Sequence, residues 1–279
     1  MIRTSQKIKF SIITCSLGDY VKLERLIKSL NRQITKNFEL IIVDQGKKQL
    51  NFKTNFSFKY FRSKKIGLSL NRNIGLKLIN RNTKYLMFLD DDCFLERNFF
   101  LNIEKIIKSI NCKFLIFPIK NIKNKNIIIK VPKGEGLIKR KVDIIKSICS
   151  SNFVIKKNNQ LFDIMLGLGS IMLSKSGEDT DYILQANKRM NFYFTNRIYV
   201  NHPNPKSNLH KTYNYGLGFS VCLMKNREYL LLFLFIINNF INLFILKKNP
   251  SFKYKKLKLY GNLYGVYYFL KYRKKFLGR

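Results

Sequence analysis

The segment Tyr85–Cys93, YLMFLDDDC, joins an apolar run to three consecutive aspartates, Asp90, Asp91 and Asp92. The chain has 279 residues, with 16 acidic residues against 53 lysines and arginines, so this concentration of negative charge needs a reason. Adjacent carboxylates repel one another and are costly to remove from water, so such a group commonly binds a cation. A hard divalent ion such as Mg²⁺ or Mn²⁺ fits this chemistry. The alternative is a solvated turn in which Asp92 caps the next helix.

The segments around this stretch alternate between two periodicities. Short apolar runs predict strands, and longer segments with apolar residues at helical spacing predict helices. The predicted strands are Lys9–Cys15, Phe38–Asp44, Phe58–Ser63 and Tyr85–Asp91, and the predicted helices are Asp19–Gln33 and Ile66–Asn82. Apolar strands that alternate with helices predict an α/β fold, with a parallel sheet covered by helices on both faces.

Polar residues follow three of these strands at their carboxyl ends. Ser16, Asp44 and the run Asp90–Asp92 all occupy such positions. Ligands of open α/β sheets bind outside the carboxyl ends of the strands, so we expect these three segments to converge on one edge of the sheet.

The second half of the chain is less regular. Its first predicted elements are a helix at Asn98–Ile110, a strand at Lys113–Lys120, an irregular stretch at 121–146 and a strand at Ser151–Lys157. A glycine- and serine-rich loop, a helix that begins at Glu178 and the β-type segment FYFTNRIYVNHPN, residues 192–204, follow. The β-type pattern of this last segment ends at His202. Acidic residues in the first turn of the helix at Glu178 suit the helix dipole.

The composition restricts the class of protein. Hydrophobic residues make up 46% of the chain, which excludes a disordered protein. The net charge of +37 suits nucleic acid, an anionic membrane or phosphate-bearing substrates. However, the chain is rich in Ile, Lys and Asn and has one alanine and no tryptophan, so the charge reflects compositional drift in part. Five scattered cysteines indicate reduced thiols in the cytosol, and the short apolar patch near the N-terminus is interpreted as a strand and not as a secretion signal.

The C-terminal part is basic and aromatic. From Tyr182 to Arg279 it has one acidic residue, Glu228. The segment Tyr229–Leu246 is long enough to be considered as a membrane span, but three asparagines share one side of a helix there. This pattern favours a helix that lies in a membrane interface, or that packs on the domain, over a clean span.

Taken in order, six blocks of the sequence resemble glycosyltransferase family 2, the nucleotide-sugar glycosyltransferases of the GT-A fold. The blocks are FSIITCSLGDYVKLERLIKSL, FELIIVDQG, IGLSLNRNIGL, YLMFLDDDC, SGEDTDYILQANKRM and YVNHPNP, within residues 8–205. The resemblance implies a Rossmann-like, mostly parallel sheet with helices on both faces in residues 1–225. A basic, hydrophobic helical tail would follow in residues 226–279 and attach to a membrane interface. The implied activity is inverting, metal-dependent transfer of a sugar from a nucleotide, UDP by default, to a glycan or lipid-linked acceptor in surface polysaccharide synthesis.

The resemblance also implies roles for residues of the donor site. The nucleoside would be held by Thr14, Ser16 and Asp44, the ribose and diphosphate by Arg72, Asn73, Asp90 and Asp91, and Mn²⁺ or Mg²⁺ by Asp92 and His202. Asp90 and Asp92 match the DxD motif, and Asp91 is expected to tolerate substitution best of the three. Gln45 departs from the family pattern, in which Asp or Asn is commoner. From the residues alone, Asp44 also suits a turn, Arg72 a helix surface and His202 a loop.

The block GEDTDY, Gly177–Tyr182, would supply the catalytic base. The resemblance implies that Asp179 is the base and that Glu178 contacts the acceptor or supports the loop, with Asp181 as the second choice for the base. The preceding Leu166–Ser170, LGLGS, would contact the acceptor and form a mobile lid, although its glycines also suit plain turns. As acids at a helix N-terminus, the three carboxylates have a structural explanation as well.

Two other classes of protein compete with this interpretation. A basic nucleic-acid-binding protein would explain the charge but not the acidic residues at the sheet edge. A metal-dependent phosphatase of the haloacid-dehalogenase type also uses Asp-x-Asp after a strand, but its motif continues to Thr or Val where this chain has Phe94. The expected partners are therefore a nucleotide-sugar, a glycan or lipid-linked acceptor and an anionic membrane surface, with no nucleic acid. The expected location is the cytoplasmic face of the cell membrane.

Overall fold

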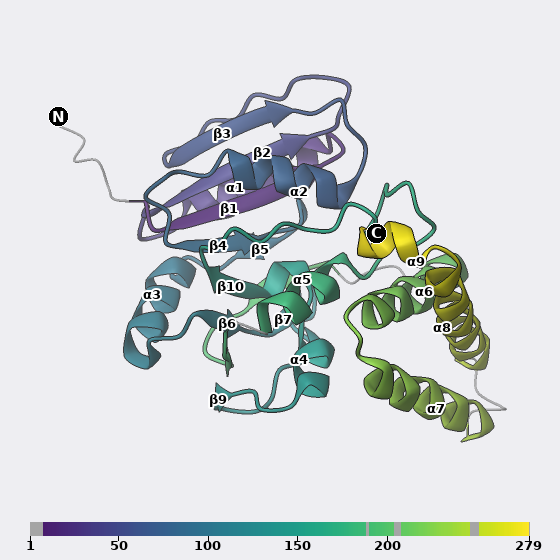
Figure 1. Ribbon diagram of the computed structural model, residues 1–279. Coiled ribbons are helices and arrows are strands. Elements are labelled where there is room, and N and C mark those ends of the chain that lie inside the picture. The colour runs from purple at the N-terminus through teal and green to yellow at the C-terminus, as the bar shows by residue number, and fades with distance from the viewer. Residues whose placement is uncertain (1–7, 188–189, 204–207, 246–250, 279) are drawn as a thin grey trace, which may run out of the picture. The chain divides into compact units, whose positions relative to one another are not determined.

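The computed structural model describes residues 8–187, 190–203, 208–245 and 251–278 (Figure 1). Backbone contacts divide these residues into two compact units. Unit 1 contains residues 8–65, 71–160 and 190–203, and unit 2 contains residues 66–70, 161–187, 208–245 and 251–278. The predicted division at residue 225 concerns function, which backbone contacts do not test, so it stays a prediction.

Unit 1 is built on a mostly parallel sheet, as predicted. Among the described residues eight strands join in the order β3-β2-β1-β4-β10-β6-β11-β9. These strands are β1 (Phe10–Ser16), β2 (Phe38–Asp44), β3 (Ser57–Arg62), β4 (Tyr85–Phe88), β6 (Phe114–Ile116), β9 (Glu135–Leu137), β10 (Phe153–Lys156) and β11 (Phe192–Thr195). The first four strands in this order are parallel to one another, whereas β10 is antiparallel to both of its neighbours.

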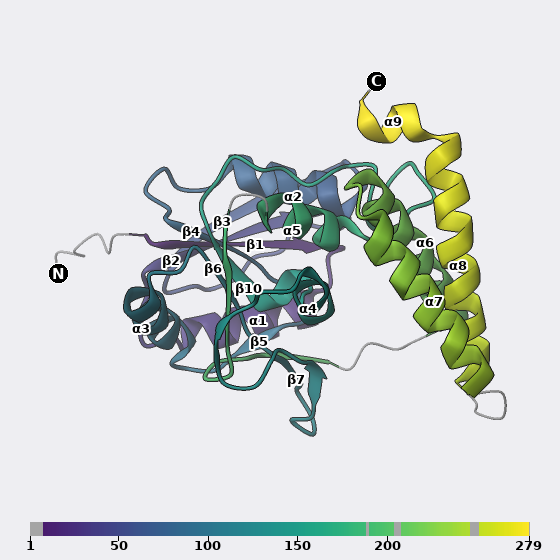
Figure 2. The ribbon, with the colours of Figure 1, turned by 60° about the horizontal axis from the view of Figure 1, so that its bottom comes forward.

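Helices cover both faces of this sheet (Figure 2). The helices α1 (Tyr20–Asn31) and α3 (Phe99–Ile110) lie on one face, and α2 (Leu68–Lys77), whose residues from 71 onward belong to unit 1, lies on the other. Successive residues of a strand point to opposite faces, so Ile12 of β1 packs in the core beneath α1 and α3. Its neighbour Ile13 touches Gly75 of α2, where an added Cβ would lie 2.5 Å from the Ile13 side chain.

The core between the sheet and α1 and α3 is rich in aromatic rings. Phe100 is fully buried, and its ring centroid lies 4.5 Å from that of Phe38 and 5.4 Å from those of Phe10 and Phe99. Such rings bury a large apolar area each and therefore dominate the stability of the packing.

Two predicted strands are each divided in two, so these predictions are wrong in part. The segment Lys113–Lys120 forms β6 and then β7 (Ile119–Asn121), and the β-type run from Phe192 forms β11 and then β12 (Val200–His202). In each case the second piece joins another sheet, of order β5-β12-β7-β8, which includes β5 (Phe94–Leu95) and β8 (Ile127–Ile129). Pro118 lies between β6 and β7, and its missing N–H prevents a continuous ladder.

The stretch predicted to be irregular, residues 121–146, contains short regular elements instead. These are β8, β9 and most of α4 (Lys141–Ser147), which a 3₁₀ turn, η1 (Ser150–Asn152), follows before β10. Three-residue strands are too short to show a periodicity, so the pattern gives no signal for them. Asn204, at the end of the predicted β-type run, lies outside the described residues.

Unit 2 is helical. Its helices, after the first residues of α2, are α5 (Glu178–Asn187), α6 (Leu209–Lys225), α7 (Tyr229–Ile245), α8 (Phe252–Lys271) and α9 (Arg273–Leu277). The backbones of α6 and α8 approach closely, because glycines occupy their contact: a side chain at Gly261 would overlap the carbonyl oxygen of Tyr213, and one at Gly265 would lie 2.5 Å from that of Leu217. The predicted helical C-terminal tail is therefore present.

The helix α7 covers the segment that we considered as a membrane span. It runs to Ile245, and Leu246 lies outside the described residues. Within the described part of the chain, none of the helices combines the length and the apolar character that crossing a bilayer requires.

The aromatic core predicts the effect of a truncation. Phe100→Ala should lower the free energy of unfolding by about 3–5 kcal/mol, because it removes a buried ring and leaves a cavity. Phe61→Ala, at a half-exposed position of β3, is the matched control and should cost well under half as much. Urea denaturation followed by circular dichroism measures both values, and equal losses would contradict the packing described.

Candidate functional site

The three aspartates form a turn directly after β4. Hydrogen bonding in the parallel pair of β1 and β4 aligns Ile13 with Phe88. Continued by three residues, this register places Ser16 opposite Asp91, and the Ser16 hydroxyl donates a hydrogen bond to Oδ2 of Asp91 at 2.7 Å. Burial and the neighbouring carboxylates Asp92 and Asp90 raise the pKa of Asp91 above its ordinary value, although Ser16 and Lys22 oppose the shift.

The antiparallel strand β10 brings two serines to the same turn. Its register pairs Val154 with Met87, so Ser151 reaches the position opposite Asp90. The backbone N–H of Asp90 donates to Oγ of Ser151 at 3.0 Å, and the hydroxyl of Ser150 donates to Oδ1 of Asp90 at 3.4 Å. Sequence reasoning missed both serines, because only an antiparallel β10 places its first residues at the carboxyl end of β4.

The second sheet brings His202 to the aspartates. The strands β5 and β12 are antiparallel and pair Asn201 with Phe94, which places His202 next to the turn. Nε2 of His202 lies 3.0 Å from Oδ1 of Asp92 and 3.5 Å from Oδ2 of Asp90. The predicted association of His202 with the DxD aspartates is therefore present in the geometry.

Charge and hydrogen bonding shift the pKa values of His202 and Asp90. Burial disfavours the charged imidazole, but the hydrogen bonds to Asp90 and Asp92 outweigh it and raise the pKa of His202 to about 10. Burial likewise disfavours the charged form of Asp90, but the hydrogen bond from His202 and the positive charge of Arg72 outweigh it, so the pKa of Asp90 is lowered. A guanidinium nitrogen of Arg72 lies 3.9 Å from Oδ1 of Asp90.

The donor set of Asp92 and His202 fits a divalent cation. Oδ1 of Asp92 is buried, and Nε2 of His202 lies 3.0 Å away, so a cation bound between the two would exchange this contact for two metal–ligand bonds. Nδ1 of His202 donates to the carbonyl oxygen of Pro203 at 2.6 Å, so Nε2 is the nitrogen that points to the carboxylates. Ligand atoms of Asp92, Cys93 and His202 lie within 4.8 Å of one another. Burial raises the pKa of Cys93 well above its ordinary value. Mn²⁺ and Mg²⁺ prefer oxygen and nitrogen ligands, so Asp92 and His202 suit them better than this thiol.

Asp44 lies beside Ser16 in the register of β1 and β2 and is fully buried. Its Oδ1 accepts from the N–H of Gly46 at 2.8 Å, and its Oδ2 accepts from the hydroxyl of Tyr60. Burial and the hydrogen bond to Asp44 raise the pKa of Tyr60 to about 12. The carboxylate therefore shapes the loop at the end of β2, and its contact with a nucleobase stays a prediction.

The remaining predicted donor residues of unit 1 are buried as well. Thr14 of β1 is fully buried, and its Oγ1 has no hydrogen-bond partner among the described residues. Arg72 and Asn73 are adjacent in α2 and buried. The alternative in which Arg72 lies on a helix surface is therefore wrong.

Burial raises the pKa of the Cys15 thiol to about 12. The charge of Arg72 lowers this pKa and that of Asp90 raises it, both by less than burial does.

The turn that carries Glu178 and Asp179 lies in unit 2. Gly177 has φ of +93°, a conformation that favours glycine, and an added Cβ there would lie 2.5 Å from the carbonyl oxygen of Gly218 in α6. The hydroxyl of Ser176 donates to the carbonyl oxygen of Asn214 at 2.9 Å. These contacts hold the start of α5 against α6, with Glu178 buried and Asp179 half-buried.

One lysine fixes this turn from the other side. Nζ of Lys225 lies 2.8 Å from Oδ2 of Asp181 and 2.6 Å from Oδ2 of Asp163. Burial disfavours the charged lysine, but Asp181 and Asp163 outweigh it and raise the pKa of Lys225. Asp181 is fully buried and also accepts from Asn226 at 2.7 Å and Gln185 at 2.8 Å. Asp181 therefore holds α5 in place and has no free access to a substrate.

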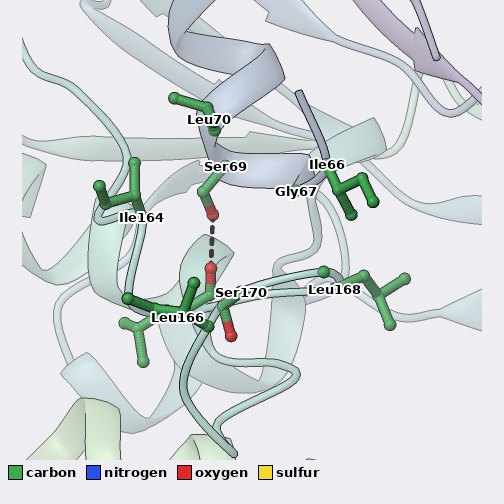
Figure 3. A pocket seen from close by; sticks show the side chains of 10 residues that line it. Ile66, Gly67, Ser69, Leu70, Ile164, Leu166, Leu168 and Ser170 are labelled. Atoms are coloured by element: carbon green, nitrogen blue, oxygen red, sulfur yellow. Dashed lines mark hydrogen bonds between the residues drawn. The ribbon is translucent and has the colours of Figure 1, made fainter. Parts of the chain in front are cut away.

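The loop Leu166–Ser170 is tied to the segment Ile66–Leu70, also in unit 2. The N–H of Leu68 donates to the carbonyl oxygen of Leu168 at 2.8 Å, and the Ser69 hydroxyl donates to that of Leu166 at 2.7 Å (Figure 3). Gly167 and Gly169 have φ of +94° and +75°, so they form turns. The two segments line a pocket of 80 Å³ with an apolar rim that includes Ile66 and Leu168.

A comparison with families of known proteins matches a large part of this chain to one of them. The sequence model described as Glycosyl transferase family 2 matches residues 11–159, more than half of the chain. This region contains β1, Asp44, Arg72 and the aspartate turn. The chain belongs to glycosyl transferase family 2.

Individual relatives agree with this family. An uncharacterized glycosyltransferase of Haemophilus influenzae is 30% identical over 115 residues, which are 39% of this chain and 38% of that protein. The crystal structure of residues 1–349 of S. aureus TarS with UDP-GlcNAc matches with a TM-score of 0.62 at 16% identity, over 94% of this chain and 73% of that one. A further S. aureus TarS structure has a TM-score of 0.59 at 18% identity, over 77% and 39%. The chain thus spans well under half of the Haemophilus protein and of this last TarS chain, and the likeness to TarS confirms the predicted GT-A fold.

The donor set predicts which variants lose metal binding. Asp92→Asn and His202→Gln should each weaken Mn²⁺ binding by more than tenfold, because removing even an outer partner of a metal site typically costs 10–100-fold. The loss of the free Mn²⁺ signal in electron paramagnetic resonance measures this binding with nucleotide present. Asp91→Asn is the matched control and should bind Mn²⁺ almost normally. Unchanged binding in both ligand variants would exclude this site for the metal.

The lysine between two aspartates predicts a loss of stability. Lys225→Met should lower the free energy of unfolding by about 3–5 kcal/mol, because it leaves the buried carboxylate of Asp181 and the partly buried one of Asp163 without their cation. Lys253→Met, at an exposed position of α8, is the matched control and should change it by less than about 0.5 kcal/mol. Urea denaturation measures both. A loss in Lys225→Met no larger than in the control would show that the bridge contributes nothing.

Proposed function

We propose that the protein is an inverting, metal-dependent glycosyltransferase that moves a sugar from a nucleoside-diphosphate donor to a hydroxyl group of an acceptor. The observation that carries the proposal is the aspartate turn of a family 2 chain, with Arg72 and His202 beside it at the carboxyl end of β4. Positive groups next to paired carboxylates suit a site that holds both a cation and a diphosphate.

The donor would bind along the carboxyl ends of β1, β2 and β4. Thr14, Ser16 and Asp44 would hold the nucleoside, and Asn73, Asp90 and Asp91 would lie near the ribose and diphosphate together with Arg72. The unpartnered, buried hydroxyl of Thr14 supports this assignment, since a bound donor could supply the missing hydrogen bond. S. aureus TarS, which shares the fold, was crystallised with UDP-GlcNAc and with UDP, and this supports a UDP-sugar as the donor.

Asp92 and His202 would hold Mn²⁺ or Mg²⁺. Such an ion neutralises the negative charge that develops on a departing diphosphate. The chain's own part is to orient the ligands: Pro203 holds His202 by its Nδ1, and Ser16 and Ser151 hold the turn. Arg72 would add a fixed positive charge near the diphosphate, which stabilises the transition state without reorganisation.

Asp179 would act as the general base and take the proton from the acceptor hydroxyl, so that the oxygen attacks the anomeric carbon and the configuration inverts in one displacement. Glu178 would contact the acceptor or support the loop Leu166–Ser170. The position of Glu178 supports the second role, because its carboxylate carbon would lie 3.0 Å from a Cβ added at Gly167. The deep burial of Asp181 supports Asp179 over Asp181 as the base.

The acceptor would be a glycan or lipid-linked saccharide in the synthesis of surface polysaccharides, at the cytoplasmic face of the cell membrane. Residues 1–225 would carry the chemistry, and residues 226–279 would attach the enzyme to the membrane. The observation in favour is that this last region combines exposed aromatic and aliphatic side chains with a large excess of lysine and arginine. Nucleic acid is not expected as a partner, because binding it would leave the acidic residues at the edge of the sheet without a role.

The base assignment predicts the behaviour of one variant. Asp179→Asn should reduce the rate of sugar transfer by about 10²–10⁴-fold, the usual contribution of a general base, while nucleotide binding stays close to normal. Transfer is measured by release of the nucleoside diphosphate, and Glu228→Gln is the matched control in the same unit. Lost donor affinity in Asp179→Asn would mean that this residue binds the donor instead.

The donor itself is tested by thermal shift with UDP-, GDP- and dTDP-sugars, with and without Mn²⁺. We expect a rise in Tm with a UDP-sugar that disappears when the metal is chelated. A shift that survives chelation would contradict the role of the metal. No shift with any nucleotide-sugar, together with salt-sensitive binding of DNA or RNA, would favour the nucleic-acid-binding alternative. Phosphatase activity without sugar transfer would favour the metal-dependent phosphatase.

A further inference from the structure

Of the three asparagines of α7 in unit 2, Asn239 faces the protein, whereas Asn238 is exposed. Asn239 and Leu232 are buried, and Nδ2 of Asn239 donates to Oδ1 of Asn262 in α8 at 3.2 Å, in the amide orientation that satisfies both groups. Nδ2 of Asn262 in turn donates to the carbonyl oxygens of Gly216 and Lys258 at 3.0 and 3.1 Å. A buried amide pair of this kind fixes which side of α7 faces α8.

The opposite side of α7 is apolar and exposed. We call this side the outer face of α7, and it consists of Leu230, Phe233, Leu234, Ile237, Phe240, Ile241 and Ile245. These side chains are between 38% and 73% exposed. At about 100° per residue they occupy an arc of roughly 140°, as on the apolar side of an amphipathic helix. An exposed apolar surface made of seven large side chains marks a site of interaction.

The helix α8 lies beside α7 (Figure 2) and also exposes apolar and aromatic side chains. Its exposed side chains at helical spacing are Tyr260, Leu263, Tyr264, Tyr267 and Leu270. Tyrosine has an apolar ring and a polar hydroxyl, so it is enriched at the boundary between hydrocarbon and water.

The charges around the outer face select the partner. No acidic residue occurs after Glu228, whereas α8 and α9 together carry the basic residues Lys253, Lys255, Lys256, Lys258, Lys271, Arg273, Lys274 and Lys275. A second copy of the chain, with its formal charge of +37, would be repelled, and an anionic bilayer would be attracted.

We propose that the outer face of α7 inserts into the interfacial region of an anionic bilayer, parallel to its plane, with the basic residues of α8 and α9 at the lipid headgroups. The proposal rests on the membrane attachment stated under the proposed function and names the surface that makes it. An apolar helix face with lysines beside it is the arrangement found in interfacial membrane helices.

The absence of tryptophan from the sequence permits a direct test with the full chain. Phe240→Trp places a single reporter on the outer face, and Phe61→Trp places one at a half-exposed position of β3 in unit 1. With vesicles of phosphatidylglycerol we expect the tryptophan emission of Phe240→Trp to shift to shorter wavelength and that of Phe61→Trp to stay unchanged. Vesicles of phosphatidylcholine should give a smaller effect, and added salt should reduce binding to the anionic vesicles.

A loss-of-binding variant provides the second measurement. Phe233→Ser with Phe240→Ser should reduce co-sedimentation with the anionic vesicles by about tenfold for each side chain removed. The matched control, Phe61→Ser with Leu137→Ser, changes two half-exposed apolar residues of unit 1 and should bind normally. Circular dichroism checks the fold of each variant, and Leu234→Trp replaces Phe240→Trp if that variant does not fold.

Two results would overturn the proposal. One is an unchanged tryptophan emission of Phe240→Trp with anionic vesicles, and the other is a shift that appears with rising protein concentration in the absence of lipid, which would identify a second copy as the partner. The thermal shift with UDP-sugar is measured on the same variants and should not change. Failure of the proposed transferase function would remove that shift and leave vesicle binding intact, so the two failures are distinguishable.

Discussion

Three adjacent carboxylates at the end of one buried strand repel one another, and unit 1 is arranged around their compensation. Each aspartate receives its partner from a different strand: Ser16 follows from the register of β1, Ser151 from that of β10, and His202 from that of β12. Because side chains alternate along a strand, a slip of one residue in any of these three pairings would turn the partner away from the turn. The chemistry of the site is thus set by strand register, across two sheets, and not by the aspartates alone.

Unit 2 also has neighbouring carboxylates that repel one another, and there a single lysine lies between them. The buried Asp181 and the partly buried Asp163 share one lysine, Lys225, in a chain whose surface carries a large excess of cations. A surface lysine is strongly hydrated and contributes little to a buried carboxylate, so the abundance of lysine elsewhere does not replace this contact. The bridge links α5, α6 and the loop at Asp163, which are the elements next to the turn of Glu178 and Asp179.

The sequence contains enough information for β1, β2, β4 and the helices that cover them, because long apolar runs and helical spacing are local signals. It also identifies Asp90, Asp92 and His202 as one group, through the resemblance to a family. The serines of residues 150 and 151 could not be found, since their role depends on the antiparallel direction of β10, which no local pattern reveals. Helical spacing places the three asparagines of α7 on one side of a helix, but that Asn239 is the one that faces the protein depends on its hydrogen bond with Asn262 in another helix. Burial of Asp181 was equally invisible, since an acid in a first helical turn is usually solvated.

The order of the elements along the chain has a consequence for how the protein is made. The hydrogen bond between Asn201 of β12 and Glu96, which follows β5, joins residues 105 positions apart. Domains synthesised on a ribosome emerge from the N-terminus, and contacts between distant residues form late. The acidic turn is therefore synthesised well before the strand that carries His202, and during that interval the nascent chain exposes the aspartates without this partner. In a polypeptide that is otherwise so basic, nearby lysines or free divalent ions in the cell can shield the turn until β12 closes the second sheet.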